Sequence, residues 1–173
     1  MNAKIILDAD VLKRSLTRIS FEIIEQNKNL NDLVLVGIKT RGITLAKRIA
    51  VRIEELENIQ IPVAELDITY FRDDKVRQKD DVAPTLPFSV LNKTVIVVDD
   101  VLYTGRTIRA ALDAILNIER PKRIALAVLI DRGHRELPIR PDYVGKNIPT
   151  SSDEDIKVHL IENDGLDEAI LYK

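Results

Sequence analysis

Two adjacent carboxylates, Asp99 and Asp100, lie between a run of four apolar residues and a turn that holds two threonines and a glycine. The turn, Thr104 to Thr107, leads into apolar residues at helical spacing. The free N–H groups and positive dipole end of a helix N-terminus favour a phosphate. The carboxylates would repel a phosphate, but they suit the vicinal hydroxyls of a ribose or the water around a magnesium ion. The segment therefore predicts a site for a sugar phosphate.

The apolar run Val95 to Val98 is typical of a buried parallel strand, whose carboxyl end is where open α/β sheets bind ligands. Two other phosphate loops are excluded, because the chain has neither a Gly-Lys-Ser/Thr after a glycine-rich run nor a G-x-G-x-x-G. The alternative is an ordinary strand with an acidic end and a capping threonine. We disfavour it because the acid pair and the hydroxyl–glycine turn occur together.

A second candidate loop, Gly37 to Gly42, also lies between a predicted strand and a predicted helix. Lys39 and Arg41 bring two cations to a helix N-terminus, which suits a diphosphate. We expect the two glycines to permit unusual backbone geometry. A plain turn with solvated charges is the alternative, and the presence of the acidic segment favours the phosphate interpretation.

A third candidate is the segment Tyr70-Phe71-Arg72-Asp73-Asp74, at the start of a polar stretch from Tyr70 to Asn92 that we call the long loop. It carries Pro84 and Pro87 and shows no clean period, although it has room for a short hairpin. Long loops of this kind inside a domain are usually lids or disordered segments. Arg72 is therefore placed to close over a diphosphate, whereas a charged surface turn is the plainer interpretation.

Strands alternate with helices along the rest of the chain. Asp8 can cap a first helix with a buried stripe of Leu12, Leu16, Ile19 and Ile23. This alternation predicts a mostly parallel sheet covered on both faces, in a single domain over residues 1–173. The other predicted elements are strands at 33–38, 62–68, 95–98 and 123–130, helices over 45–56 and from 108 to the Arg120-Pro121 pair, and a C-terminal hairpin of 157–161 with 169–172.

Composition is that of a soluble globular protein. The chain has 173 residues, 45% hydrophobic and 31% charged, and its net charge of −2 gives no global indication of nucleic-acid binding. Cysteine is absent and there are only two histidines, so we expect no disulfide and assign no metal-ligating residues. No apolar run approaches the ~20 residues of a membrane span and no signal-peptide core is present, which predicts a cytoplasmic protein without a membrane partner.

The acidic segment and its turn resemble the phosphoribosyl-diphosphate motif of type I phosphoribosyltransferases. That resemblance implies an α/β fold with a mostly parallel central sheet flanked by helices and a small hood region. It also makes Gly37 to Gly42 the diphosphate loop, and the long loop a flexible hood over the site. Asp131 to Thr150, rich in Arg, His and Lys, lies where this family recognises the base. With that segment, nearly the whole chain resembles a family of bifunctional regulators of pyrimidine operons that are also uracil phosphoribosyltransferases.

As an enzyme, such a protein joins uracil to phosphoribosyl diphosphate, giving UMP and diphosphate, with Mg²⁺ accompanying the phosphoribosyl diphosphate. Catalysis rests on positioning and electrostatics, without a nucleophile or triad. The resemblance implies catalytic roles for Asp99, Asp100, Arg41 and Arg72. Arg132 is expected on the pyrimidine side. The other residues expected to bind substrate are Thr40, Val101, Leu102, Tyr103, Thr104, Gly105, Arg106 and Thr107.

As a regulator, such a protein binds a stem-loop in leader mRNA when UMP or UTP is bound, which promotes transcription termination and so attenuates pyrimidine biosynthesis. The residues expected to contact RNA are Thr17, Arg18, His134, Arg135, Arg140 and Lys146. The resemblance also implies a homodimer or higher homo-oligomer. Phe21 departs from it, because family members commonly have histidine there; a phenylalanine can stack on a base, join the core or contact a second subunit. The part of the long loop from Lys75 to Asn92 is a few residues shorter than expected.

Two alternatives stay open from the sequence. One is an RNA-binding regulator that uses the phosphate loops only as a nucleotide sensor, with little or no transferase activity. The other is a purine-type phosphoribosyltransferase without an RNA role, although the basic segment at 131–146 is not expected in such an enzyme.

Overall fold

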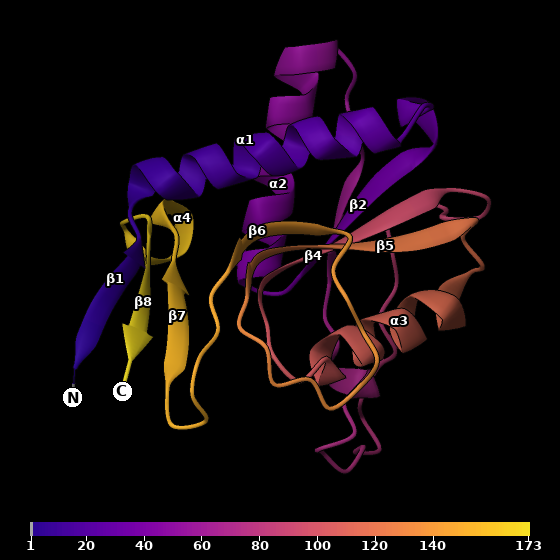
Figure 1. Cartoon of the computed structure of the whole chain (residues 1–173). Helices are drawn as coiled ribbons and strands as arrows, with labels where there is room; N and C mark the ends of the chain where they lie inside the picture. The colour runs from indigo at the N-terminus through magenta and orange to yellow at the C-terminus, as the bar shows by residue number, and fades with distance from the viewer. Residues whose placement is uncertain (1) are drawn as a thin grey trace.

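Five parallel strands form the central sheet of the computed structural model, which describes residues 2–173. Their order across the sheet is β3-β2-β4-β5-β6 (Figure 1). Their bounds are β2 Leu33–Ile38, β3 Val63–Leu66, β4 Thr94–Leu102, β5 Arg123–Asp131 and β6 Tyr143–Asn147. The predicted parallel sheet is confirmed, but β6 was not predicted. It is an edge strand within a polar segment, and only its Tyr143 and Gly145 are buried.

Helices cover both faces of this sheet, as the alternation of elements predicts. Helices α1 (Ala9–Gln26) and α2 (Arg41–Glu57) pack on one face, and α3 (Arg106–Ile118) packs on the other. Strand β4 shows why both faces must be covered, since Ile96 and Val98 face one core cluster while Val95 and Val97 face the other. A run buried on both sides is what its unbroken apolar sequence indicates.

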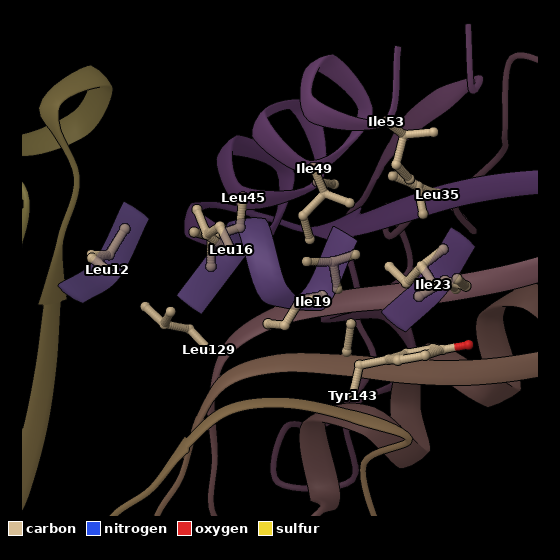
Figure 2. Close-up of a cluster of buried hydrophobic side chains, with 14 of the residues drawn as sticks. Leu12, Leu16, Ile19, Ile23, Leu35, Leu45, Ile49, Ile53, Leu129 and Tyr143 are labelled. Carbon is tan, nitrogen blue, oxygen red and sulfur yellow. The ribbon is translucent and has the colours of Figure 1, made fainter. Parts of the chain in front are cut away.

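The larger core cluster lies between α1, α2 and the sheet. The predicted stripe of α1 is confirmed, because Leu12, Leu16, Ile19 and Ile23 are all buried. They point toward α2 and the sheet in Figure 2. Asp8 caps the helix as predicted, with its carboxylate accepting a hydrogen bond from Val11 N at 2.9 Å. This packing fixes α1 across β6 and α2 (Figure 1).

A separate three-stranded antiparallel sheet, in the order β1-β8-β7, stands beside the parallel one (Figure 1). The predicted C-terminal hairpin is confirmed, with the short helix α4 at its turn. The added strand β1 was not predicted, because a five-residue segment gives little local signal and its partner β8 lies at the opposite end of the chain. The bounds are β1 Ala3–Leu7, β7 Asp155–His159, α4 Ile161–Asp164 and β8 Glu168–Tyr172.

The long loop begins within a short 3₁₀ helix, η2 (Thr69–Phe71). A second 3₁₀ helix, η1 (Leu30–Asp32), precedes β2. The long loop contains no strand, so the hairpin that its length allowed is not formed. Its second half is fixed to α3, because the Glu119 carboxylate accepts hydrogen bonds from Ser89 Oγ at 2.8 Å and from Val90 N at 2.6 Å. Residues 72–82 of the loop are all exposed, whereas exposed and partly buried residues alternate in its second half. Across residues 2–173, no helix is long and apolar enough to cross a membrane.

Candidate active site

A cavity of about 460 Å³ opens where the carboxyl ends of β2, β3 and β4 meet. It brings together the acid pair, the second loop and the start of the long loop, as the sequence predicts from the carboxyl ends of parallel strands. Asp99, Asp100 and Thr40 all line it. The full lining is Ile38, Lys39, Thr40, Asp67, Ile68, Thr69, Arg72, Asp99, Asp100, Val101 and Thr107.

A second cavity of about 220 Å³ adjoins the first, and both are lined by Arg72 and Thr107. Its remaining lining residues are Asp73, Asp74, Thr104 and Arg106. The predicted phosphate turn thus lines both cavities, and the second loop lines the larger one. Such a site has room for a phosphate at each end and a sugar beside the carboxylates between them.

Gly37 and Gly42 allow the second loop to pack directly against its neighbours. A Cβ on Gly37 would lie 2.3 Å from Ile43 Cα, and one on Gly42 would lie 2.4 Å from the carbonyl oxygen of Val98. Neither glycine has a positive φ, so the expectation of unusual backbone geometry at these glycines is wrong. Their small size is what counts, because it lets α2 begin against the strand that carries the acid pair. The unusual peptide is the cis bond between Lys39 and Thr40.

The phosphate turn meets the geometric requirements of an anion site. Gly105, which caps α3, has a φ of 93°, a conformation that glycine adopts without steric cost. Arg106 N donates to Thr104 Oγ1 at 3.3 Å, while Thr107 is exposed in the first turn of the helix. Thr104 and Thr107 therefore line the smaller cavity beside the N-terminus of a 13-residue helix, whose positive dipole end favours an anion.

The two carboxylates differ in environment. Asp99 is 8% exposed, and burial together with the negative charge of Asp100 raises the pKa of its carboxyl well above the ordinary value. Asp100 is half-buried, lines the cavity and accepts a hydrogen bond from Val101 N at 2.8 Å. Asp100 is thus the more accessible of the two carboxylates and the better placed to bind hydroxyls.

We expect Asp99→Asn to raise the melting temperature of the ligand-free, magnesium-free protein at pH 8. With its pKa raised in the folded state, Asp99 makes the protein less stable as pH rises from the unfolded-state pKa toward the folded one. Asparagine cannot ionise, so the difference should shrink toward zero as the pH falls to about 4. Scanning calorimetry at several pH values measures it, and for a chain of this size each ~1 kcal/mol corresponds to about 2–4 °C. A variant less stable than the original protein at pH 8 would contradict this assignment.

The structure pairs the predicted arginines with carboxylates. Arg72 binds Asp74, with Nε 2.8 Å from the carboxylate. Arg41 does not line the cavity, because its guanidinium turns to Asp164 of α4, 2.8 Å away. Its role toward a diphosphate stays a prediction, whereas Lys39 and Thr40 of the same loop do face the cavity.

Arg132 follows the end of β5 and is 5% exposed. It donates to Thr150 Oγ1 and to Asp155, each at 3.1 Å, and its guanidinium lies 4.0 Å from the centre of the Tyr103 ring. It is not among the residues lining the two cavities, so a contact with a pyrimidine stays a prediction. Tyr103, by contrast, is 38% exposed and covers Arg132.

The predicted RNA-contacting residues lie on both sides of the edge strand β6. Arg18 of α1 donates to the carbonyls of Val144 and Gly145, directly before the exposed Lys146. Thr17 lies beside Arg18 on the same helix and is half-buried. Phe21 is 52% exposed, which excludes the core among the roles considered for it.

The other predicted RNA contacts lie in the segment between β5 and β6. His134 is exposed, with Nε2 2.5 Å from Thr150 O, and Arg140 is exposed as well. Arg135 is partly buried and makes internal bonds, to Asp131 at 2.6 Å and to Tyr103 O at 2.8 Å. RNA binding by these residues stays a prediction.

Three acidic residues that line the two cavities, Asp67, Asp73 and Asp74, had no predicted function. Asp67 follows β3, and hydrogen bonds from Thr69 lower its carboxyl pKa. The carboxyl-end rule that identified Asp99 would also have found Asp67. Asp73 and Asp74 follow Arg72 in the chain, but only the fold shows that they line the smaller cavity.

Comparison with known proteins agrees with this geometry. The family model described as phosphoribosyl transferase domain matches residues 2–160. A bifunctional protein pyrR of Enterococcus faecalis is 59% identical over 178 residues, which covers 100% of this chain and 98% of that protein. A bifunctional protein PyrR of Brevibacillus brevis is 56% identical over 170 residues, covering 96% of this chain and 95% of that one.

A solved structure, the hypoxanthine phosphoribosyltransferase of Trypanosoma cruzi, superposes with a TM-score of 0.75 over 97% of this chain and 95% of that one, at 19% identity. At that identity the likeness shows the shared fold alone. The matched domain and the full-length relatives go further: the chain belongs to the phosphoribosyltransferase family and, within it, to the bifunctional PyrR proteins.

Proposed function

We propose that this protein is a uracil phosphoribosyltransferase that also regulates transcription attenuation of pyrimidine operons by binding leader mRNA when UMP or UTP is bound. The observation that carries the enzymatic half is the acid pair Asp99–Asp100 between two phosphate-binding loops in one continuous site. The full-length relatives support both halves, since they are named bifunctional.

In the reaction, uracil displaces diphosphate at the anomeric carbon of phosphoribosyl diphosphate, through a transition state with oxocarbenium character. The turn from Thr104 to Thr107 holds the 5′-phosphate, Asp100 binds the ribose hydroxyls, and Lys39 and Thr40 face the diphosphate. No side chain needs to form a bond to the sugar. Holding the reactants in line and neutralising the leaving group account for the catalysis.

The donor set fits magnesium bound together with the substrate. Carboxylates of Asp67, Asp99 and Asp100 line the larger cavity. Among residues 2–173, no cluster of three or more acidic, histidine or cysteine side chains is arranged to hold a metal ion by itself. Magnesium commonly uses one or two carboxylates plus substrate oxygens, and it would neutralise charge on the leaving diphosphate. Asp100 and Asp67 are the residues we propose for it.

The regulatory half rests on direct bonds between the phosphate turn and the predicted RNA segment. The carbonyl oxygen of Thr104 accepts hydrogen bonds from Glu136 N at 2.9 Å and Leu137 N at 3.2 Å, and Arg135 binds the carbonyl of Tyr103. Through these hydrogen bonds, a nucleotide phosphate bound at the turn would order the segment that carries His134 and Arg140. We also propose a homodimer or higher homo-oligomer in the cytoplasm.

Arg140→Ala is expected to weaken binding of a leader stem-loop without slowing uracil transfer. Arg140 is exposed and does not line either cavity. If it contacts an RNA phosphate, the slope of log affinity against log salt should shrink by about one. Filter binding across a salt series measures the slope, with Lys4→Ala, an exposed lysine on β1, as the control. An unaltered slope would remove Arg140 from the RNA surface, and a slowed transferase would place it in the active site.

The test of the enzymatic half compares uracil with hypoxanthine, guanine and orotate as acceptors of the phosphoribosyl group. We expect UMP formation with uracil and negligible product with the other bases. Product from a purine would favour the purine-type alternative, and no product with any base alongside UMP-dependent RNA binding would favour the sensor alternative.

A further inference from the structure

Each arginine that lines the smaller cavity is already paired with a carboxylate of the protein itself. Arg106, the first residue of α3, lies 3.0 Å from Asp73 and 2.8 Å from Glu136. Arg72 is paired with Asp74. These ion pairs hold the pKa values of both guanidinium groups above their ordinary range. The cations next to the phosphate turn are therefore not free to meet a ligand without exchanging partners.

Asp73 and Asp74 belong to the cavity that a phosphate would enter, together with Thr104, Arg106 and Thr107. Carboxylate and phosphate oxygens compete for the same N–H donors, and arginine binds both in the same forked geometry. A phosphate brought within this cavity also meets repulsion from the two carboxylates. Asp73 and Asp74 thus oppose phosphate binding in two ways, by occupying the donors and by their charge.

Asp73 also ties the long loop to α3 across 33 residues of chain. Arg109, one turn further along α3, lies 3.8 Å from the Asp73 carboxylate and donates to Phe71 O at 3.2 Å. The start of the loop is therefore held at the rim of the cavity by Asp73 and, separately, by a backbone carbonyl. Removing the Asp73 charge releases the first tie and leaves the second.

We propose that Asp73, supported by Asp74, is an internal substitute for the 5′-phosphate. It binds Arg106 in the free protein, holds the first half of the long loop against α3, and is displaced when the phosphate of UMP or phosphoribosyl diphosphate binds. Because Asp73 competes with the phosphate, the protein binds the phosphate more weakly than it would without Asp73. The inference rests on the proposed function, because that function supplies the phosphate.

The expected effect is a gain of affinity, which few substitutions in a binding site produce. We expect Asp73→Asn to bind UMP about two- to fivefold more tightly than the original protein at low salt. The effect is modest because the Arg106 and Asp73 side chains are 47% and 40% exposed, and exposed ion pairs are weak. Raising the salt from about 50 to 500 mM should reduce the gain, because the charges are screened.

Isothermal titration of UMP measures this, with Asp113→Asn as the matched control. Asp113 lies on α3 and pairs with Arg109, 3.1 Å away. Asp113→Asn therefore removes one negative charge next to Arg109, which is also near Asp73, but Asp113 does not line the cavity. Tighter binding in Asp73→Asn alone supports the proposal. Unchanged or weaker binding overturns it, and so does an equal gain in both variants, because that would be a general charge effect.

Trypsin cleavage tests the loop tie without any ligand. Arg77 and Lys79 are exposed in the first half of the long loop, four and six residues beyond Asp73. In the free proteins, cleavage there should be faster in Asp73→Asn than in the original protein or Asp113→Asn, and saturating UMP should abolish the difference. Equal rates in the free proteins would overturn the tie. If the original protein bound neither UMP nor phosphoribosyl diphosphate, the proposed function would fail, whereas the ligand-free cleavage would still decide the tie.

Discussion

Asp100→Asn is expected to lower kcat/KM for uracil transfer by about 10- to 150-fold while the protein remains folded. The loss corresponds to about 1.5–3 kcal/mol, which is typical of one hydrogen bond to a charged group. The fold should survive because asparagine can still accept the hydrogen bond that Val101 N donates to Asp100 Oδ1 at 2.8 Å. Steady-state kinetics with purified protein, together with a melting curve, measure both quantities.

The matched control for this prediction is Asp113→Asn, since Asp113 is also acidic but is exposed and lies outside both cavities. It should retain the original kcat/KM. An unchanged kcat/KM in Asp100→Asn would contradict the assignment of the acid pair to the ribose. A loss confined to the melting temperature would instead make Asp100 a structural residue.

Gly42→Ala is expected to destabilise the protein by about 1–3 kcal/mol, and more if the backbone cannot move. The added Cβ would lie 2.4 Å from the carbonyl oxygen of Val98, so either the start of α2 or the end of β4 must shift. The shift separates the second loop from the acid pair, and the KM for phosphoribosyl diphosphate should rise together with the loss of stability. Denaturant unfolding and steady-state kinetics measure the two effects.

Gly165→Ala is the control that separates the steric effect of an added Cβ from the effect of restricted backbone conformation. Gly165 has a φ of 84° and no atom within 4 Å of its added Cβ, so alanine there meets only the conformational penalty of roughly 1–2 kcal/mol. Gly165 follows α4, away from both cavities, and its substitution should leave the KM unchanged. If Gly42→Ala also left the KM unchanged, close packing of this loop would not be what positions the site.

The candidate site was predictable from sequence where its chemistry is local. The acid pair, the threonine–glycine turn and the strand before them are contiguous, so the apolar run and its end specify both the strand and what it presents. The resemblance to a family extended this to the base and the RNA, which residue types alone left open. The parallel sheet followed because each predicted strand is separated from the next by a helix or a long connection.

What the sequence could not supply depends on pairings between distant residues. The charge of Arg41 beside a predicted helix N-terminus indicates a diphosphate, but its ion-pair partner Asp164 lies 123 residues away in the chain. Strand β1 exists because its partner β8 is at the other end of the chain. The sequence around Asp73 indicates a charged surface turn, and only the folded structure shows its ion pair with Arg106. No local pattern carries these contacts.

The measurement that tests the central claim most directly is a titration of a pyrimidine-operon leader stem-loop against the protein across a range of UMP concentrations. One nucleotide site is proposed to serve both functions, and the bonds from Thr104 O to Glu136 N and Leu137 N join it to the predicted RNA segment. UMP should therefore tighten RNA binding, by roughly 5- to 150-fold for a typical coupling, and RNA should tighten UMP binding by the same factor. RNA affinity that ignores UMP would contradict the account and leave a phosphoribosyltransferase without a regulatory role.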